Sequence, residues 1–542
     1  MSLADGYVRE IFEALLARRD VDEHTWLLAQ CGEYAVPVLL EHLASGDFER
    51  QKIACYGLQF CWDPVARVPV EKLLEHADER LRDMGAQVLS KHYSLAEIAR
   101  VSRRLEDHPH PEVSGHAVSH LEAQQPDLAR VRKVLADARR APWLWKFLPR
   151  YYASDLTPGT RALLEDALNE ADFAPNVACA ALAALAMQND RSAETRLRAR
   201  ALLKHTHAGV RELAAEFLAW QGALEDAAIL RAAAEKEQDV HTGASLRAAE
   251  ESIVRRCAAW PSAIDHARAL EIFAASEDME PYFAYKGDDP DPRFVQLREA
   301  RLDALAKLFV ISGHQRGAAR EYLGDFNASE ARRVATPVRD YLDTNRTSFA
   351  LLSDSTNKDF KGQVHVGDDV AWFRDLSTVA AMADGLVRRA GHFETWGYMV
   401  ILEHRTARGE FFCSLYAHMS PFVTVRAGEC VRLGQKIGSV GRSFTWENGG
   451  YAAHLHFAVH RGPYVQIKQP GDKVDVRYKN KLYTGTVVIA DANETVARID
   501  SWFGPHLVHL PATWVRGYIS PQQWYARRHG FMDPQRVVRE NQ

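Results

Sequence analysis

The apolar residues of this 542-residue chain change their spacing near residue 345. Before that point they recur every three to four positions, which is the period of a helix with one buried side. After it they alternate with polar residues, as in a half-buried β-strand. Two long stretches with different periods predict a multidomain protein, in which an all-α part precedes a β part.

The helical part, residues 1–260, also repeats a motif. A polar turn is followed by a helix that begins with an apolar residue and continues with small residues. The apolar positions stand 32, 64 and 33 residues apart and are Leu81, Val113, Val177 and Val210. A period of this length indicates stacked helix pairs. The pattern resembles HEAT-type repeats and predicts an N-terminal all-α HEAT-like solenoid; an irregular helical bundle is the alternative.

Four further units are expected from changes of pattern along the chain. Residues 261–345 remain helical in pattern but lose the period, so they predict a helical connector. Residues 346–469 predict an antiparallel β domain. Residues 470–517 contain short alternating strands that interrupt the end of this domain and resemble an SH3-like or Tudor-like barrel. Residues 518–542 predict a closing helix, from Gln522, and a tail.

Strands can be assigned within the β domain and the barrel. Residues 379–387 predict a hairpin with its tight turn at Asp384 and Gly385. Residues 398–403 and 411–416 predict two strands joined by a polar turn. The barrel contains aromatic side chains that could line a ligand cage or simply fill a small core. They are Tyr478, Tyr483, Trp502 and Trp514.

The charge and cysteine content exclude several classes of protein. The net charge is −5 and the sequence pI is about 6.5, which does not favour nucleic-acid binding. The purest apolar run, residues 177–187, is too short to span a membrane, and the first residues lack the pattern of a secretory signal. Seven cysteines without a Cys-x-x-Cys pair favour free thiols in a reducing compartment. The expected location is therefore the cytoplasm.

Chemistry concentrates in two short segments that could share a metal ion. In the segment His454-Leu-His456, alternate side chains of a strand share one face, so both imidazoles point the same way. His365 and Asp369 stand four residues apart around Gly367. Zinc accepts imidazole nitrogen and carboxylate oxygen, and two histidines with one carboxylate leave a fourth position for water.

Five motifs in order give a resemblance to a known family. They are His365-x-Gly-x-Asp369, Ala383-Asp-Gly-x-Val387, Tyr416-Ala-His418, the glycine series from Gly428 to Gly441, and His454-Leu-His-Phe457. Together they resemble the lysostaphin-type (LytM-like) metalloendopeptidases, which cut peptide cross-links of bacterial peptidoglycan. The resemblance covers about residues 360–465. It implies an antiparallel β domain with a duplicated hybrid motif and one zinc ion at the floor of a groove.

The resemblance also implies roles for five residues. His365, Asp369 and His456 would bind Zn2+, while His418 and His454 would be catalytic and act on a water activated by the zinc. The adjacent Asp368 is the rival carboxylate, but neighbours in a strand point to opposite sides. Asp368 is therefore expected in solvent at the groove rim or paired with Arg374. The chain departs from the family at positions that border the groove, namely Ala452, Ala453, Ala458 and residues 371–374.

The sequence therefore predicts a zinc-dependent endopeptidase, with peptidoglycan cross-links as its expected substrate and a protein partner on the helical repeats. Two alternatives remain at this point. One is a binding or regulatory protein on a peptidase-like scaffold without catalysis. The other is a peptidase that acts on a cytoplasmic protein. A peptidoglycan substrate would require the cell envelope or export.

Overall fold

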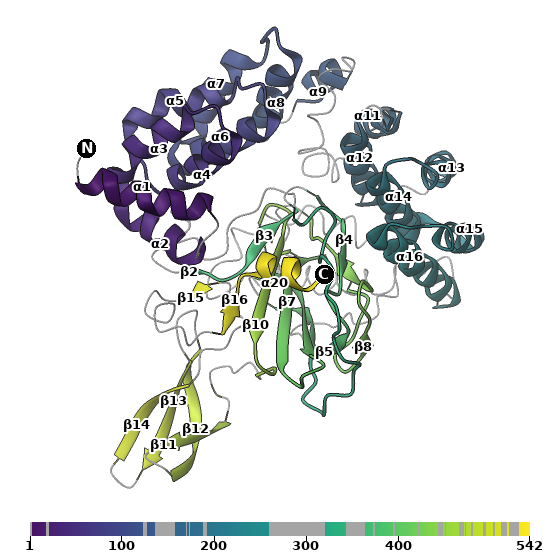
Figure 1. Cartoon of the computed structure of the whole chain (residues 1–542). Helices are drawn as coiled ribbons and strands as arrows, with labels where there is room; N and C mark the ends of the chain where they lie inside the picture. The colour runs from purple at the N-terminus through teal and green to yellow at the C-terminus, as the bar shows by residue number, and fades with distance from the viewer. Residues whose placement is uncertain are drawn as a thin grey trace.

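The structure is a computed structural model that covers the helical part and the β part (Figure 1). It describes residues 3–17, 21–122, 127–135, 158–169, 171–172, 174–187, 192–259, 320–342, 364–371, 374–393, 396–420, 423–442, 448–449, 451–465, 471, 473–478, 481–490, 495–501, 504–510, 518–519 and 530–542.

The N-terminal part is all-helical, as the apolar period predicts. Its helices are α1 (Leu3–Leu16), α2 (Val21–Cys31), α3 (Val36–Leu43), α4 (Phe48–Leu58), α5 (Arg67–Leu73), α6 (Glu79–His92), α7 (Leu95–Leu105), α8 (Pro111–Glu122), α9 (Leu128–Leu135), α11 (Pro158–Leu168), α12 (Pro175–Met187), α13 (Ala193–Leu202), α14 (Ala208–Gln221), α15 (Leu224–Ala234) and α16 (Val240–Ala259). Consecutive helices pack in pairs, for example α3 with α4 and α15 with α16. Each pair buries the apolar stripe that neither helix could bury alone.

The 32-residue period is also visible in the turns between helix pairs. His76, His108 and His205 each accept a hydrogen bond at Nδ1 from the backbone N–H two residues later. The first two stand 32 residues apart, and the third follows after 97, which is close to three periods. Arg82 and Arg211 also occupy equivalent positions in two of these turns. The guanidinium of each donates to the backbone carbonyls of the residues five and six positions before it. The assignment of these pairs to the HEAT class remains a prediction.

The C-terminal part is built from antiparallel sheets, as predicted. The largest sheet runs β1-β5-β6-β7-β10-β16, with β3 against β10 and β8 against β5. The strands of this part, apart from the inserted barrel, are β1 (Arg320–Glu321), β2 (Val364–His365), β3 (Asp368–Val370), β4 (Thr378–Ala380), β5 (Gly385–His392), β6 (Tyr398–Arg405), β7 (Phe411–Met419), β8 (Cys430–Val431), β9 (Lys436–Ser439), β10 (Leu455–Arg461), β15 (Tyr518–Ile519) and β16 (Phe531–Met532).

The two faces of β10 have different surroundings. Leu455, Phe457 and Val459 point into the main core of the β domain. His456 and Ala458 alternate with them and therefore lie on the opposite face, where Ala458 packs with Leu415 and other apolar residues. The predicted segments 398–403 and 411–416 fall within β6 and β7, which pair as a hairpin.

Two local expectations are wrong, and a third lies partly outside the described residues. The hairpin predicted over residues 379–387 does not form, because β4 pairs with β9 and β5 pairs with β6. The described end of the expected helical connector, residues 320–342, contains no helix, and its strand β1 pairs with β5. The first part of the closing helix expected from Gln522, residues 522–529, lies outside the described residues. After it, Phe531 and Met532 form β16, and the helix α20 runs over Pro534–Asn541.

A four-stranded antiparallel sheet is inserted between β10 and the last strands of the β domain. It consists of β11 (Lys473–Tyr478), β12 (Lys481–Ala490), β13 (Thr495–Ser501) and β14 (Gly504–Leu510). The chain then returns, because β15 pairs with β2, β16 pairs with β10, and α20 packs near β10 (Figure 1). Tyr483 packs against the core of the small sheet, whereas Trp502 and Trp514 lie outside the described residues. The SH3-like or Tudor-like class remains a prediction.

The helical part packs against the ribbon of β4 and β9. Leu376, just before β4, is fully buried within the helical core. Two carboxylates one turn apart on α14 point into the same contact. Glu212 accepts hydrogen bonds from the N–H of Thr378, at 2.6 Å, and from Arg339. Glu216 pairs with Lys436 of β9.

The structure also bears on the expected thiols and membrane segments. The side chains of six cysteines are described, and each is a free thiol. Among the described residues, no helix combines the length and the apolar character needed to cross a bilayer.

Candidate metal centre

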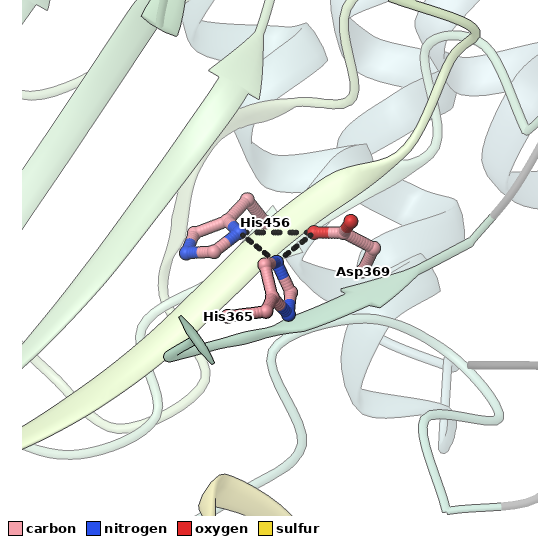
Figure 2. A group of neighbouring side chains, drawn as sticks. All are labelled: His365, Asp369 and His456. Atoms are coloured by element: carbon pink, nitrogen blue, oxygen red, sulfur yellow. Dashed lines mark hydrogen bonds and ion pairs between the residues drawn. The ribbon is translucent and has the colours of Figure 1, made fainter. Parts of the chain in front are cut away.

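The side chains of His365, Asp369 and His456 come together beside the paired strands β3 and β10 (Figure 2). His365 Nε2 lies 3.2 Å from His456 Nδ1 and 3.3 Å from Asp369 Oδ1. His456 Nδ1 lies 2.9 Å from the same carboxylate oxygen. Both histidines are buried, and the Asp369 side chain is 13% exposed. The three residues come from β2, β3 and β10.

Strand register and one glycine produce this convergence. β3 pairs with β10 so that Asp369 stands directly opposite His456. Opposed residues of an antiparallel pair project to the same face, so the carboxylate and the imidazole share a side of the sheet. Gly367 connects the strands of His365 and Asp369. Any side chain at this position would overlap the ring of His456, so the close approach requires glycine.

The separations fit a tetrahedral cation better than hydrogen bonds alone. If His456 Nδ1 donates a hydrogen bond to Asp369, the same nitrogen cannot accept a hydrogen bond from His365. His365 Nε2 nevertheless lies only 3.2 Å from it. Zinc ligands at about 2.0–2.1 Å in tetrahedral geometry stand about 3.3 Å from one another. The three separations, 2.9–3.3 Å, are close to that value. These three residues therefore fit a tetrahedral metal ion, and their donor atoms suit Zn2+.

The protonation states also suit a cation. Burial lowers the pKa of His456 to about 4, so its ring is neutral at pH 7. Burial alone would raise the pKa of Asp369, but the neighbouring histidines, His365 first, hold it well below its usual range. A neutral imidazole and an ionised carboxylate are the forms that bind zinc, so metal binding near neutral pH need not displace a proton from either group.

His418 and His454 lie beside this cluster, with their rings 4.5 Å apart. His454 Nε2 is 3.7 Å from Asp369 Oδ1. Burial lowers the pKa of both histidines, so both are neutral near pH 7. His418 has a left-handed backbone, with φ of 59°, and its carbonyl accepts a hydrogen bond from Gly441 at 2.9 Å. Strained backbone of this kind costs about 1–3 kcal/mol and is concentrated at functional sites.

Aromatic residues that the sequence analysis did not identify surround the histidines. The ring of Trp396 stacks on that of His418 at 5.5 Å and meets that of His456 edge-on at 5.1 Å. Tyr451 lies 4.7 Å from His418. Ala29 of α2 packs against the same apolar cluster as Trp396, so the helical part also reaches this face. No single-sequence motif marks these residues, because their contacts depend on the folded arrangement.

Asp368 points away from the metal cluster, as the strand geometry predicts, but its expected surroundings are wrong. The side chain is fully buried, not solvated at a groove rim. It accepts a hydrogen bond from the Tyr341 hydroxyl at 2.6 Å. Arg374 instead lies near Asp340. The alternation of β3 thus places one carboxylate in the metal cluster and the next in the core.

Comparison with known proteins agrees with this geometry. No curated protein matches the chain. The family model of Peptidase family M23 matches residues 363–476, a range that contains the three clustered residues and both neighbouring histidines. The match supports a peptidase of a kind that is typically metal-dependent. Within the longer polypeptide, residues 363–476 therefore form a LytM-like domain of peptidase family M23.

Proposed function

We propose that this protein is a zinc-dependent endopeptidase of the lysostaphin type, which hydrolyses peptide cross-links of peptidoglycan. The observation that carries the proposal is the cluster of His365, Asp369 and His456, whose ligand atoms all lie within 4.8 Å of one another. Two further buried histidines beside a complete ligand set favour catalysis over a scaffold that has lost its chemistry.

Each residue has a separate task in this proposal. His365, Asp369 and His456 hold the ion. A bound Zn2+ would lower the pKa of a coordinated water to about 7 and polarise the scissile carbonyl. His454, which approaches Asp369 through Nε2, accepts a proton from the attacking water. The protonated His454 would then return this proton to the leaving amine, so the proton taken from the water is accounted for. His418, whose ring lies 4.5 Å from that of His454, would help to polarise the attacking water through Nε2.

We further propose that the helical repeats position the peptidase domain on a partner or on its substrate. Stacked helix pairs present a long surface, which suits binding to an extended partner. A peptidoglycan substrate requires that the protein act in the cell envelope. A protein substrate would instead allow it to act in the cytoplasm.

The decisive experiment is mass spectrometry of purified peptidoglycan after incubation with the full chain, with and without a chelator. New amino termini within the cross-links, absent in the presence of chelator, are the expected result. His418→Ala and His454→Ala should reduce hydrolysis by about two to four orders of magnitude while zinc remains bound. Intact peptidoglycan after incubation with the zinc-loaded protein would contradict this substrate. Cleavage of a protein substrate by the same sample would instead favour a cytoplasmic peptidase.

A further inference from the structure

The two histidines beside the metal cluster are oriented by a single short loop. Nδ1 of His418 lies 2.7 Å from the backbone carbonyl of Asn448. Nδ1 of His454 lies 2.7 Å from the backbone carbonyl of Ala452. A carbonyl oxygen can only accept, so each Nδ1 must carry the proton. In the neutral ring, Nε2 is then the nitrogen that can accept a proton.

The side chain of Asn448 closes this loop on itself. Its Nδ2 donates to the carbonyl of Tyr451 at 2.9 Å, and its Oδ1 accepts from the Tyr451 N–H at 3.2 Å. Gly449 between them has a φ of 86°, which favours glycine and lets the chain reverse. Asn448 is itself fully buried. The amide therefore fixes the distance between residue 448 and residues 451–452.

We infer that Asn448 is a positioning residue that selects the Nδ1–H tautomer of both His418 and His454. The inference rests on the proposed function, because it concerns the same two histidines. The carbonyl that accepts from His418 belongs to Asn448 itself. The carbonyl that accepts from His454 belongs to Ala452, the residue after Tyr451, and the Asn448 side chain bonds to Tyr451. Loss of the amide would release both acceptors together. Each ring could then turn, or move its proton to Nε2, where it can no longer accept a proton from water.

A close packing contact adds to this argument. The Asn448 side chain lies directly against Gly441, where a Cβ would overlap it. Gly441 in turn donates its N–H to the carbonyl of His418. Asn448 thus supports His418 at two points, through its own carbonyl at the ring and through Gly441 at the backbone. His454 is held at one point, through Ala452.

The test uses the zinc-loaded full chain labelled with 15N-histidine. Multiple-bond 1H–15N spectra distinguish a proton on Nδ1 from one on Nε2, and the signals are assigned with His418→Gln and His454→Gln. In the unmodified chain both residues should show the Nδ1–H form. In Asn448→Ala both signals should change, kcat should fall about 10²-fold, and KM and zinc content should stay nearly constant. Asn448→Asp keeps the oxygen that accepts from the Tyr451 N–H but loses the N–H that donates to the Tyr451 carbonyl. Its kcat should therefore lie between those of the unmodified chain and Asn448→Ala.

Gln221→Ala is the matched control, because it also removes a buried amide that bonds to one carbonyl, but in the helical part. It should leave both histidine signals and kcat unchanged. The inference is overturned when Asn448→Ala keeps both Nδ1–H signals, or when Gln221→Ala lowers kcat equally. Should Asn448→Ala fail to fold, unchanged signals in Asn448→Asp would overturn it. The spectra do not depend on turnover, so a protein that cleaves nothing would refute the proposed function while the tautomers still test Asn448.

Discussion

Glu216 of helix α14 and Lys436 of strand β9 form a buried ion pair between residues 220 positions apart. Their side chains are only 3% and 5% exposed. The second oxygen of Glu216 accepts a hydrogen bond from the Ser439 hydroxyl at 3.0 Å. Ser439 also accepts, through its carbonyl, the N–H of Ser420, two residues after His418. The helical part is therefore bonded to the strand that supports one of the two histidines beside the metal cluster.

Removal of one partner of this pair should destabilise the protein strongly. Lys436→Met leaves the buried Glu216 carboxylate without its cation, which typically costs about 3–5 kcal/mol. Urea unfolding followed by tryptophan fluorescence measures the loss. Glu540→Gln is the control, because it breaks the exposed pair with Arg536 and should cost less than about 1 kcal/mol. Equal, small losses in the two variants would show that water reaches Glu216.

The full chain should bind about one zinc ion, since one closed set of three ligands occurs among the described residues. His456→Ala should reduce the zinc content nearly to zero, because it removes the nitrogen that faces both other ligands. His454→Ala should retain most of the metal. Elemental analysis of protein purified without added metal provides the measurement. Full zinc content in His456→Ala would contradict the ligand assignment.

The two adjacent carboxylates should respond differently to the same substitution. Asp369→Asn should weaken zinc binding strongly, as measured by titration with a competing chelator. Asp368→Asn should leave zinc affinity nearly unchanged but reduce the free energy of unfolding by about 1–3 kcal/mol, because its hydrogen bond with Tyr341 is buried. A double-mutant cycle with Tyr341→Phe should be non-additive. A larger loss of zinc affinity in Asp368→Asn would mean that the register of β3 is different.

Stability should fall between pH 6.5 and 4 because of His404. Burial lowers the pKa of this histidine to about 4, and its Nε2 lies 2.7 Å from the Ser414 hydroxyl. In the unfolded chain His404 has an ordinary pKa of about 6.5, so it binds a proton at a higher pH there than in the folded protein. The free energy of unfolding therefore has its full value above pH 6.5 and decreases as the pH falls toward 4. The slope from this group is about 1.4 kcal/mol per pH unit.

His404→Gln should reduce this slope, since an amide can keep a donor and an acceptor without titrating. Urea midpoints measured from pH 7 to pH 4.5 in both proteins give the difference. Identical slopes would show that other groups account for the whole pH dependence.

The sequence allowed prediction of the all-α and β parts because hydrophobic period is a local property. The 32-residue spacing of Leu81 and Val113 was visible for the same reason, since each repeat makes the same local contacts. The convergence of His365, Asp369 and His456 could also be predicted from short motifs, while their role as metal ligands stays a prediction. Strand pairing was harder. The alternation in residues 379–387 marks strands but not partners, so nothing local distinguished a hairpin from the pairing of β4 with β9.

The buried partners of polar side chains could not be predicted. An aspartate such as Asp368 is expected to be exposed when only its neighbours in sequence are considered. Its burial depends on a hydrogen bond from Tyr341, which lies 27 residues earlier in the chain. The carbonyl of Asn448 carries no sequence signal at all, since every residue has one. The contact between α14 and β9 joins two units with different periods. Neither Glu216 nor Lys436 is unusual within its own unit.

The inserted sheet has a consequence for the order in which the chain is completed during synthesis. His365 and His456 lie on β2 and β10, but the neighbours of these strands, β15 and β16, follow the insertion. Ribosomes add roughly 5–20 residues per second, so a nascent chain passes through an interval in which His365, Asp369 and His456 have all emerged while β15 and β16 are missing. A protein made in this way acquires its finished β domain only after the ribosome has translated residues 518–532.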